Sequence, residues 1–209
     1  MKYLIISGID GSGKTTIIEH LEKALIQQGF SVDIVWMRYN HYLVKVMNAF
    51  ARMAGLSVKV NNEMGDVWEH RLYQSPLFCK VYVWCSYIDN LFAKYKVAKL
   101  KSDYIICDRW VNDILIDLGA ECRIDNILDN VWYTRFHNLL PLHSVEFVIQ
   151  RNLDELLSCR VENHTNPDFK YRLALYQKLT EKKSIHTINN VRTVAESVQQ
   201  ILDIIDEKK

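Results

Sequence analysis

The chain has 209 residues and a formal net charge of +1 at pH 7, with 49% hydrophobic and 24% charged residues. This length suffices for one domain with a sizeable core, and the composition is that of a folded protein rather than a disordered one. The near-zero charge argues against polymeric nucleic acid or an anionic membrane as a partner, because both require an excess of Lys and Arg to neutralise phosphate.

Apolar runs typical of strands alternate with segments of helical periodicity along the chain. Strands are predicted at residues 3–7, 32–36, 104–107, 145–149 and 185–188. Helices are predicted at 14–28, 41–54, 77–100, 113–118, 125–139, 153–162, 169–183 and 193–206. The segment 57–74 is ambiguous and is expected to contain loop. This order predicts a single α/β domain over 1–209, with three layers: a parallel sheet of about five strands and helices on both faces.

The cysteines and the longest apolar stretch indicate in which cellular compartment the protein is expected. Five scattered cysteines have neither an even count nor CxxC spacing. They do not form the pattern of a disulfide framework or a zinc site, so they favour a reducing compartment and a cytoplasmic protein. The stretch 77–93 is interrupted by Lys80 and Asp89, so no membrane span is predicted.

The most specific motif directly follows the first predicted strand. Residues 8–16 read GIDGSGKTT, which matches the phosphate-binding pattern GxxxxGK[ST] and leads into a predicted helix. Glycines let successive backbone N–H groups point at phosphate oxygens, and the helix N-terminus adds positive potential. Lys14 is expected to bridge the β- and γ-phosphates of ATP, and the Thr15 hydroxyl to ligate Mg²⁺. The predicted ATP-binding residues here are Gly8, Gly11, Ser12, Gly13, Lys14, Thr15 and Thr16.

Two arginines follow other predicted strands. Asp108 ends the apolar run YIICD and is expected to hold Mg²⁺ or its water shell, and Arg109 comes next. The planar fork of Arg109 suits the clamping of a phosphoryl group. Arg38 closely follows the strand 32–36 and is expected to hold an acceptor phosphate, because a kinase of unphosphorylated nucleosides would need a carboxylate there as a base. An [NT]KxD motif is absent from the sequence, which argues against a signalling GTPase.

Together, GIDGSGKTT at 8–16 and the triplet Asp108-Arg109-Trp110 resemble the motif pair of the thymidylate kinase family. Residues 169–179 resemble the helix after that family's lid, and the similarity extends through most of the chain. The resemblance implies a P-loop kinase that uses ATP and Mg²⁺ to phosphorylate a nucleoside monophosphate, with dTMP as the first candidate. It also implies a homodimer formed through helices, for which 77–93 is long and apolar enough.

The resemblance also implies roles for individual side chains. Asp10 corresponds to an acidic residue that contacts the acceptor sugar and organises the site. The implied catalytic group is Asp10, Lys14 and Arg109. A short lid is expected at about 160–172, where Arg160 and Arg172 would bind on the ATP side and stabilise charge on the phosphoryl group.

The chain departs from the family in the expected acceptor pocket. Counting back from Asp108 puts Trp84 where the family has an aromatic that stacks on thymine, and Ile88 where it has an arginine that reads the base. The segment 40–74 is longer than usual and is expected to reshape the pocket. The implied acceptor-binding residues are Arg38, Trp84, Asp108 and Arg109. The base itself stays unspecified.

Two other functions remain open at this point. The fold and the phosphate loop do not determine the acceptor, so a kinase of another small phosphorylated metabolite or of a nucleoside is one alternative. A regulatory module that binds ATP without phosphorylating a small acceptor is the other. Incubation with ATP·Mg²⁺ and a panel of acceptors separates the three.

Overall fold

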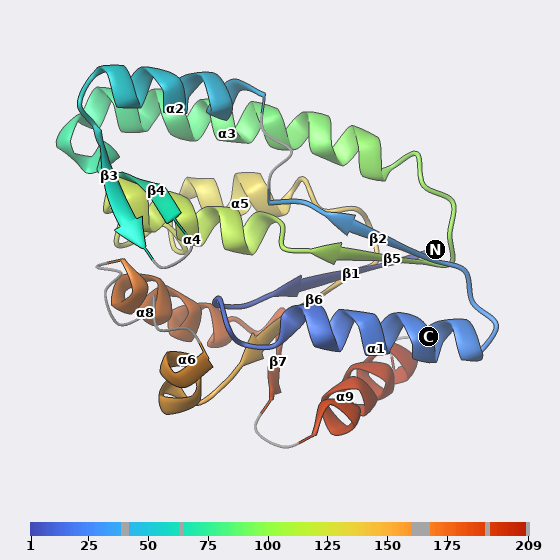
Figure 1. Cartoon of the computed structure of the whole chain (residues 1–209). Coiled ribbons are helices and arrows are strands. Elements are labelled where there is room, and N and C mark those ends of the chain that lie inside the picture. Colours follow the sequence, from blue (N-terminus) through green and yellow to red (C-terminus); the bar gives the residue numbers. More distant parts are fainter. Residues whose placement is uncertain (39–41, 63–64, 160–167, 191–192, 208–209) are drawn as a thin grey trace.

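A parallel sheet of five strands forms the middle layer of the computed structural model, which describes residues 1–38, 42–62, 65–159, 168–190 and 193–207 (Figure 1). The strand order is β2-β5-β1-β6-β7. The bounds are β1 (Lys2–Ser7), β2 (Val32–Trp36), β5 (Tyr104–Asp108), β6 (Ser144–Gln150) and β7 (Ile185–Asn189). All five strands predicted from apolar runs are confirmed, and so is the α/β class with three layers.

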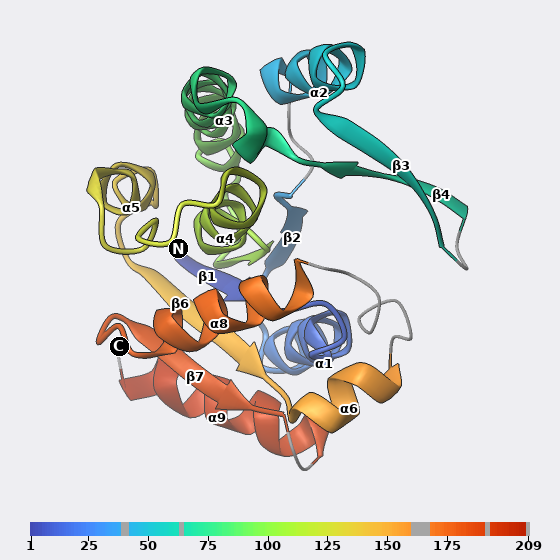
Figure 2. The same cartoon turned by 90° about the vertical axis from the view of Figure 1, so that its left-hand side faces the viewer.

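Helices cover both faces of this sheet (Figures 1 and 2). Their bounds are α1 (Lys14–Gln27), α2 (Leu43–Met53), α3 (Pro76–Val97), α4 (Val111–Cys122), α5 (Val131–His137), α6 (Leu153–Cys159), α8 (Phe169–Thr180) and α9 (Val194–Glu207). Successive side chains of β1 alternate between the two faces. Leu4 and Ile6 lie in the core with α1 and α9, whereas Tyr3 and Ile5 lie in the core that contains α3 and α4.

The segment between α2 and α3 differs from the prediction of loop. It forms an antiparallel hairpin of β3 (Ser57–Asn62) and β4 (Gly65–His70), followed by a short 3₁₀ turn at Leu72–Gln74. Figure 2 shows this hairpin extending from the end of α2, apart from the main sheet. The alternation of Val58 and Val60 with polar neighbours was an available signal for a strand.

Two predicted helices have different bounds. The helix expected at 125–139 begins only at Val131, where the Asn130 side chain accepts a hydrogen bond from Trp132 N–H at 2.9 Å and so caps the helix. By contrast, α4 extends beyond the predicted 113–118. Nearly all of its residues are buried, Asn112 and Asp113 among them, so α4 lacks the solvent-exposed face that usually marks a helix in sequence. In the described part of the chain, no helix combines the length and apolar character that crossing a bilayer requires.

Candidate functional site

Sheet register brings three segments together at the carboxyl ends of β1, β2 and β5. Asp108 of β5 pairs with Ile6 of β1 on one side and with Trp36 of β2 on the other. Backbone hydrogen bonds continue this pairing past the strands. Arg109 N–H donates to Ile6 O at 2.9 Å, and Met37 N–H donates to Asp108 O at 3.0 Å. The segments that follow the three strands therefore meet at one edge of the sheet.

The glycine-rich loop after β1 has a backbone that requires glycine. Gly11 and Gly13 have φ of 90° and 91°, in the left-handed region that other residues rarely adopt. A Cβ on Gly13 would lie 2.4 Å from Asn190 Nδ2. The Asn190 amide donates to Ser12 O at 2.9 Å and so ties the loop to the end of β7. Because α1 begins directly after Gly13, the unpaired N–H groups of its first turn lie at the loop, as phosphate binding requires.

Lys14 lies folded under this loop. Its side chain is 5% exposed, and Nζ donates to Ile9 O at 2.8 Å and lies 3.4 Å from Ser12 Oγ. Burial, together with the positive charge of Arg109, lowers the pKa of Lys14 to about 7. A polyanionic ligand in the loop would favour the charged form.

Asp10, in the loop itself, pairs with two arginines. Arg109 Nη2 donates a hydrogen bond to Asp10 Oδ1, and Arg38 Nη1 lies 3.5 Å from Oδ2. Burial opposes ionisation of Asp10, but the attraction of Arg109 and Arg38 outweighs it and holds the pKa well below its usual range. Arg109 has φ of 62°, an uncommon conformation for a residue other than glycine and one that clusters at functional sites.

Asp113 of α4 connects the same region to α8, and the sequence analysis did not assign it. Its Oδ1 accepts a hydrogen bond from Tyr176 Oη at 2.7 Å. The same oxygen lies 3.5 Å from Arg109 Nη1 and 3.5 Å from Gly8 N. With a side chain only 1% exposed, Asp113 is a fixed negative charge behind the loop and behind Arg109.

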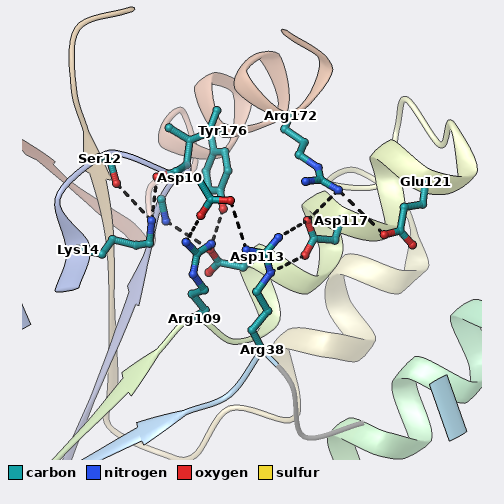
Figure 3. A network of polar contacts seen from close by, with 12 residues as sticks. Asp10, Ser12, Lys14, Arg38, Arg109, Asp113, Asp117, Glu121, Arg172 and Tyr176 are labelled. Carbon is teal, nitrogen blue, oxygen red and sulfur yellow. Dashed lines mark hydrogen bonds and ion pairs between the residues drawn. The ribbon is translucent and has the colours of Figure 1, made fainter. Parts of the chain in front are cut away.

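Positive and negative side chains alternate from the loop along α4 (Figure 3). Arg38 Nε and Nη2 donate to the two carboxylate oxygens of Asp117 at 3.2 and 3.3 Å. Arg172 of α8 lies 3.4 Å from Asp117 and 4.0 Å from Glu121. The acidic residues 113, 117 and 121 recur every four positions, a helical spacing that the sequence showed but that was not recognised.

A cavity of about 340 Å³ lies beside these charges, within the range of roughly 300–1,000 Å³ that small-molecule sites occupy. Residues from α2, β4, α3 and α4 surround it. They are Arg38, Val44, Lys45, Asn48, Trp68, His70, Tyr82, Ser86, Ile114, Asp117, Leu118 and Glu121. The long segment 40–74 thus contributes to the wall of this cavity through α2 and β4.

The predicted stacking residue Trp84 does not lie at this cavity. Its ring packs edge-to-face on Trp132 of α5, with centroids 4.9 Å apart, and it is absent from the described residues that line the cavity. The side chains that α3 presents there are Tyr82 and, one turn later, Ser86. Counting back through the turn between α3 and β5 therefore placed the helix register two residues out.

The structure does not place the two arginines assigned to the lid together at the glycine-rich loop. Arg160 lies outside the described residues, as does most of the predicted lid. Arg172 is in the first turn of α8, and its described ion pairs are with Asp117 and Glu121 rather than with the glycine-rich loop. Among the described residues, its buried Nε has no hydrogen-bond partner.

A second cavity, of about 260 Å³, lies on the other side of the loop, at the carboxyl ends of β6 and β7. Its lining includes Ile9, Gln150, Arg151, Tyr176 and Asn189. Arg151 Nη1 donates to Gly11 O at 3.4 Å, so this cavity is in contact with the loop. The loop borders this cavity directly, and it is connected to the cavity toward α4 through the ion pair of Asp10 with Arg38.

Oxygen atoms suitable for Mg²⁺ lie at the end of β5 and the start of α1. Asp108 Oδ1 is buried and has no hydrogen-bond partner among the described residues. Burial raises the pKa of Asp108, which Arg109 and Lys14 oppose, and a divalent cation would favour the ionised form further. Thr15 is exposed in the first turn of α1. These oxygens fit the predicted roles of Thr15 and Asp108 in holding Mg²⁺ or its water shell.

Glu121 lies at the end of the charged series. Burial and the negative charge of Asp117 raise the pKa of Glu121 to about 7, against the opposing effect of Arg172 and Arg38. In an unfolded chain a glutamate titrates near pH 4.3. The folded state therefore binds the proton more tightly. The stability that Glu121 contributes is fully present below about pH 4.3 and is lost as the pH rises through about 7.

We expect the Glu121→Gln variant to become more stable relative to wild type as the pH rises from about 5 to about 8, because the amide does not ionise. The measurement is the difference in Tm between the two proteins across this range. The matched control is Glu19→Gln, at an exposed position of α1, for which no such trend is expected. A constant Tm difference for Glu121→Gln would contradict the raised pKa.

Comparison with solved structures identifies the fold, whereas the two comparisons of sequence find no match. The sequence matches no protein-family model, and no curated protein matches it. A solved structure of thymidylate kinase from Candida albicans aligns with 99% of this chain and 92% of its own chain, with a TM-score of 0.62 and 13% sequence identity. The chain has a thymidylate kinase-like P-loop fold. The glycine-rich loop, Asp108 and Arg109 thus lie at the carboxyl edge of the parallel sheet of this fold, where ligands of open α/β sheets bind.

Proposed function

We propose that this protein transfers the γ-phosphoryl group of ATP to a nucleoside monophosphate. The observation that carries the proposal is a cavity that borders the glycine-rich loop at Ile9 and a second cavity lined by Arg38, which pairs with Asp10 of the loop beside Arg109. A phosphoryl transfer needs two phosphate-bearing ligands to meet at such a loop. The thymidylate kinase-like fold supports the same proposal.

The residues of the loop would bind and orient the donor. Backbone N–H groups of 11–15 and the Lys14 ammonium would hold the β- and γ-phosphates, with Nζ moving from Ile9 O to a phosphate oxygen. Bound Mg²⁺, held by Thr15 and Asp108, would supply neutralisation of charge on these phosphates. Arg109, held by Asp10 and Asp113, would stabilise charge on the transferred group without reorganising.

The acceptor would occupy the cavity toward α4. Arg38 is at the junction of the loop and the cavity, and its N–H groups now face Asp10 and Asp117. An acceptor phosphate would replace part of this carboxylate contact. The resemblance implied dTMP as the acceptor. The presence of Ser86 where an arginine would read thymine weakens that assignment, since a serine cannot supply the same fork.

The test is incubation with ATP·Mg²⁺ and a panel of ribo- and deoxyribonucleoside monophosphates, with unphosphorylated nucleosides as a second set. We expect ADP release above the acceptor-free rate with at least one monophosphate, and the corresponding diphosphate as product. Turnover only with unphosphorylated compounds would support the nucleoside or metabolite alternative. Tight ATP binding without turnover on any acceptor would support the regulatory module.

A homodimer and a cytoplasmic location stay predictions. α3 carries exposed apolar side chains along its length, and contiguous patches of this kind commonly mark interfaces. They are Leu77, Val81, Trp84, Ile88, Leu91, Phe92 and Tyr95. We propose that a second copy covers this surface. Sedimentation should then give twice the chain mass of 24.6 kDa, and a monomer at micromolar concentration would contradict the proposal.

A further inference from the structure

We propose that the cavity toward α4 selects an acceptor whose base carries an exocyclic amino group, as cytosine and adenine do, and that Glu121 is the residue that reads it. This inference rests on the proposed function, since it concerns the acceptor of that reaction. It differs from the dTMP assignment, because thymine presents a carbonyl oxygen where cytosine presents an amino group.

Both carboxylate oxygens of Asp117 already contact arginines. Its Oδ1 accepts from Arg38 Nη2 at 3.3 Å and lies 3.4 Å from Arg172, and its Oδ2 accepts from Arg38 Nε at 3.2 Å. A carboxylate held in this way positions the arginines. It has little capacity left for a ligand.

Glu121 lines the same cavity but is only weakly engaged. Its described ion pair is with Arg172 Nη2 at 4.0 Å, too long for a hydrogen bond. Its side chain is 18% exposed, so it is largely desolvated yet accessible from the cavity. A carboxylate in that position gains most from a ligand that donates hydrogen bonds, because unmade bonds of a buried polar group are costly.

The position of Glu121 along α4 matches the base end of an acceptor. Asp113 contacts Arg109 and Gly8 at the phosphate loop, Asp117 lies one turn further, and Glu121 lies two turns further. A rise of 1.5 Å per residue puts Glu121 about 12 Å from Asp113 along the helix axis. An acceptor with its phosphate at the loop would therefore bring its base, rather than its phosphate, toward Glu121.

The opposite wall of the cavity fits a base but offers no arginine to read a carbonyl. α3 presents the ring of Tyr82, an aromatic surface for stacking, and the small neutral Ser86. Tyr82 Oη donates to Asn48 at 2.9 Å, which fixes the ring. Carboxylates accept from amino groups of bases, whereas arginine and lysine pair with carbonyl oxygens. Lys45 lines the cavity from α2, so the preference for an amino-bearing base rests on Glu121 and on the absence of an arginine from the α3 side.

The test uses pairs of monophosphates that differ only at the position of the amino group: dCMP with dUMP, and AMP with IMP. Assays at about pH 8 keep Glu121 mostly ionised. We expect wild-type kcat/KM to favour the amino member of at least one pair by about 10- to 100-fold. In Glu121→Gln this ratio should fall to near one, because the amide offers both a donor and an acceptor in the same shape. The control Glu19→Gln should keep the wild-type ratio.

Three outcomes would overturn the inference. One is a wild-type preference for dTMP or dUMP over dCMP together with IMP over AMP. Another is an unchanged ratio in Glu121→Gln. The third is a change in the ratio of CMP to dCMP in that variant without a change in the dCMP-to-dUMP ratio, which would assign Glu121 to the sugar. Absence of turnover with every monophosphate would overturn the proposed function itself, so the two failures are distinguishable.

Discussion

The Lys14→Met variant should lose acceptor-dependent ADP formation, with kcat at least about a thousandfold below wild type. Lys14 is the one cation inside the glycine-rich loop sequence 8–16, and its ammonium is held at Ile9 O, ready to exchange onto a phosphate oxygen. Methionine keeps the length of the buried stem but offers neither charge nor donor. The measurement is single-turnover and steady-state ADP release with the best acceptor of the panel.

The fold should survive this change. The pKa of Lys14 is lowered to about 7 by burial and by Arg109, which means that the folded state disfavours the charged form of the ammonium. Methionine places no charge in this buried position, so the Tm of the variant without bound ligand should not fall. The control is Lys23→Met, an exposed position on α1, which should keep the wild-type rate. Wild-type turnover in Lys14→Met would remove this residue from the mechanism.

Replacement of Arg109 should lower kcat by about a hundredfold or more, both in Arg109→Ala and in Arg109→Lys. Arg109 reaches Asp10 and Asp113 at once, and the fork of the guanidinium is what makes both contacts possible. A lysine keeps the charge but lacks the fork, so the two variants should share the loss of rate. Rapid-quench measurement of the phosphoryl-transfer step separates this loss from slow product release.

Stability separates the two variants. Arg109→Ala removes the arginine partner of the buried Asp113 and one of the two arginines at Asp10, and it should lower the free energy of unfolding by about 3 kcal/mol, whereas Arg109→Lys should lose less. Adding Asp10→Asn to Arg109→Ala should restore part of the stability and none of the rate. If Arg109→Lys turned over like wild type, Arg109 would act only as a counter-ion to the two aspartates.

Local features of the sequence predicted the fold and the phosphate loop. The five strands are continuous apolar runs because both faces of the sheet are covered, and such runs are visible without tertiary information. The loop motif is local as well, since its function depends on the backbone of a few consecutive residues. Arg38, Asp108 and Arg109 were predictable at one edge because parallel strands end at the same edge of a sheet.

The acceptor side depends on contacts between distant segments. Arg38 and Asp117 are 79 residues apart in the chain, and their pairing follows from the docking of α4 beside β2 rather than from any local pattern. Tyr82 was missed because its place on α3 depends on the length of the turn before β5. The hairpin β3–β4 was missed because its strands are short and largely polar. Arg38, Asp117 and Tyr82 line the cavity in which we propose that the acceptor binds, and β4 of the hairpin adds to its wall.

The shared carboxylates of Asp10 and Asp117 have a further consequence for the reaction. In the proposed reaction they neutralise Arg38 before an acceptor arrives, so bound ATP would face a site in which part of the positive charge is already paired. An acceptor phosphate releases that charge at the moment when both ligands are present. In the proposed reaction, Asp10 and Asp117 would therefore compete with the acceptor phosphate for Arg38, and they would protect ATP from hydrolysis while the acceptor cavity is empty. By reciprocity, a bound donor that draws on the same arginines changes the affinity for the acceptor.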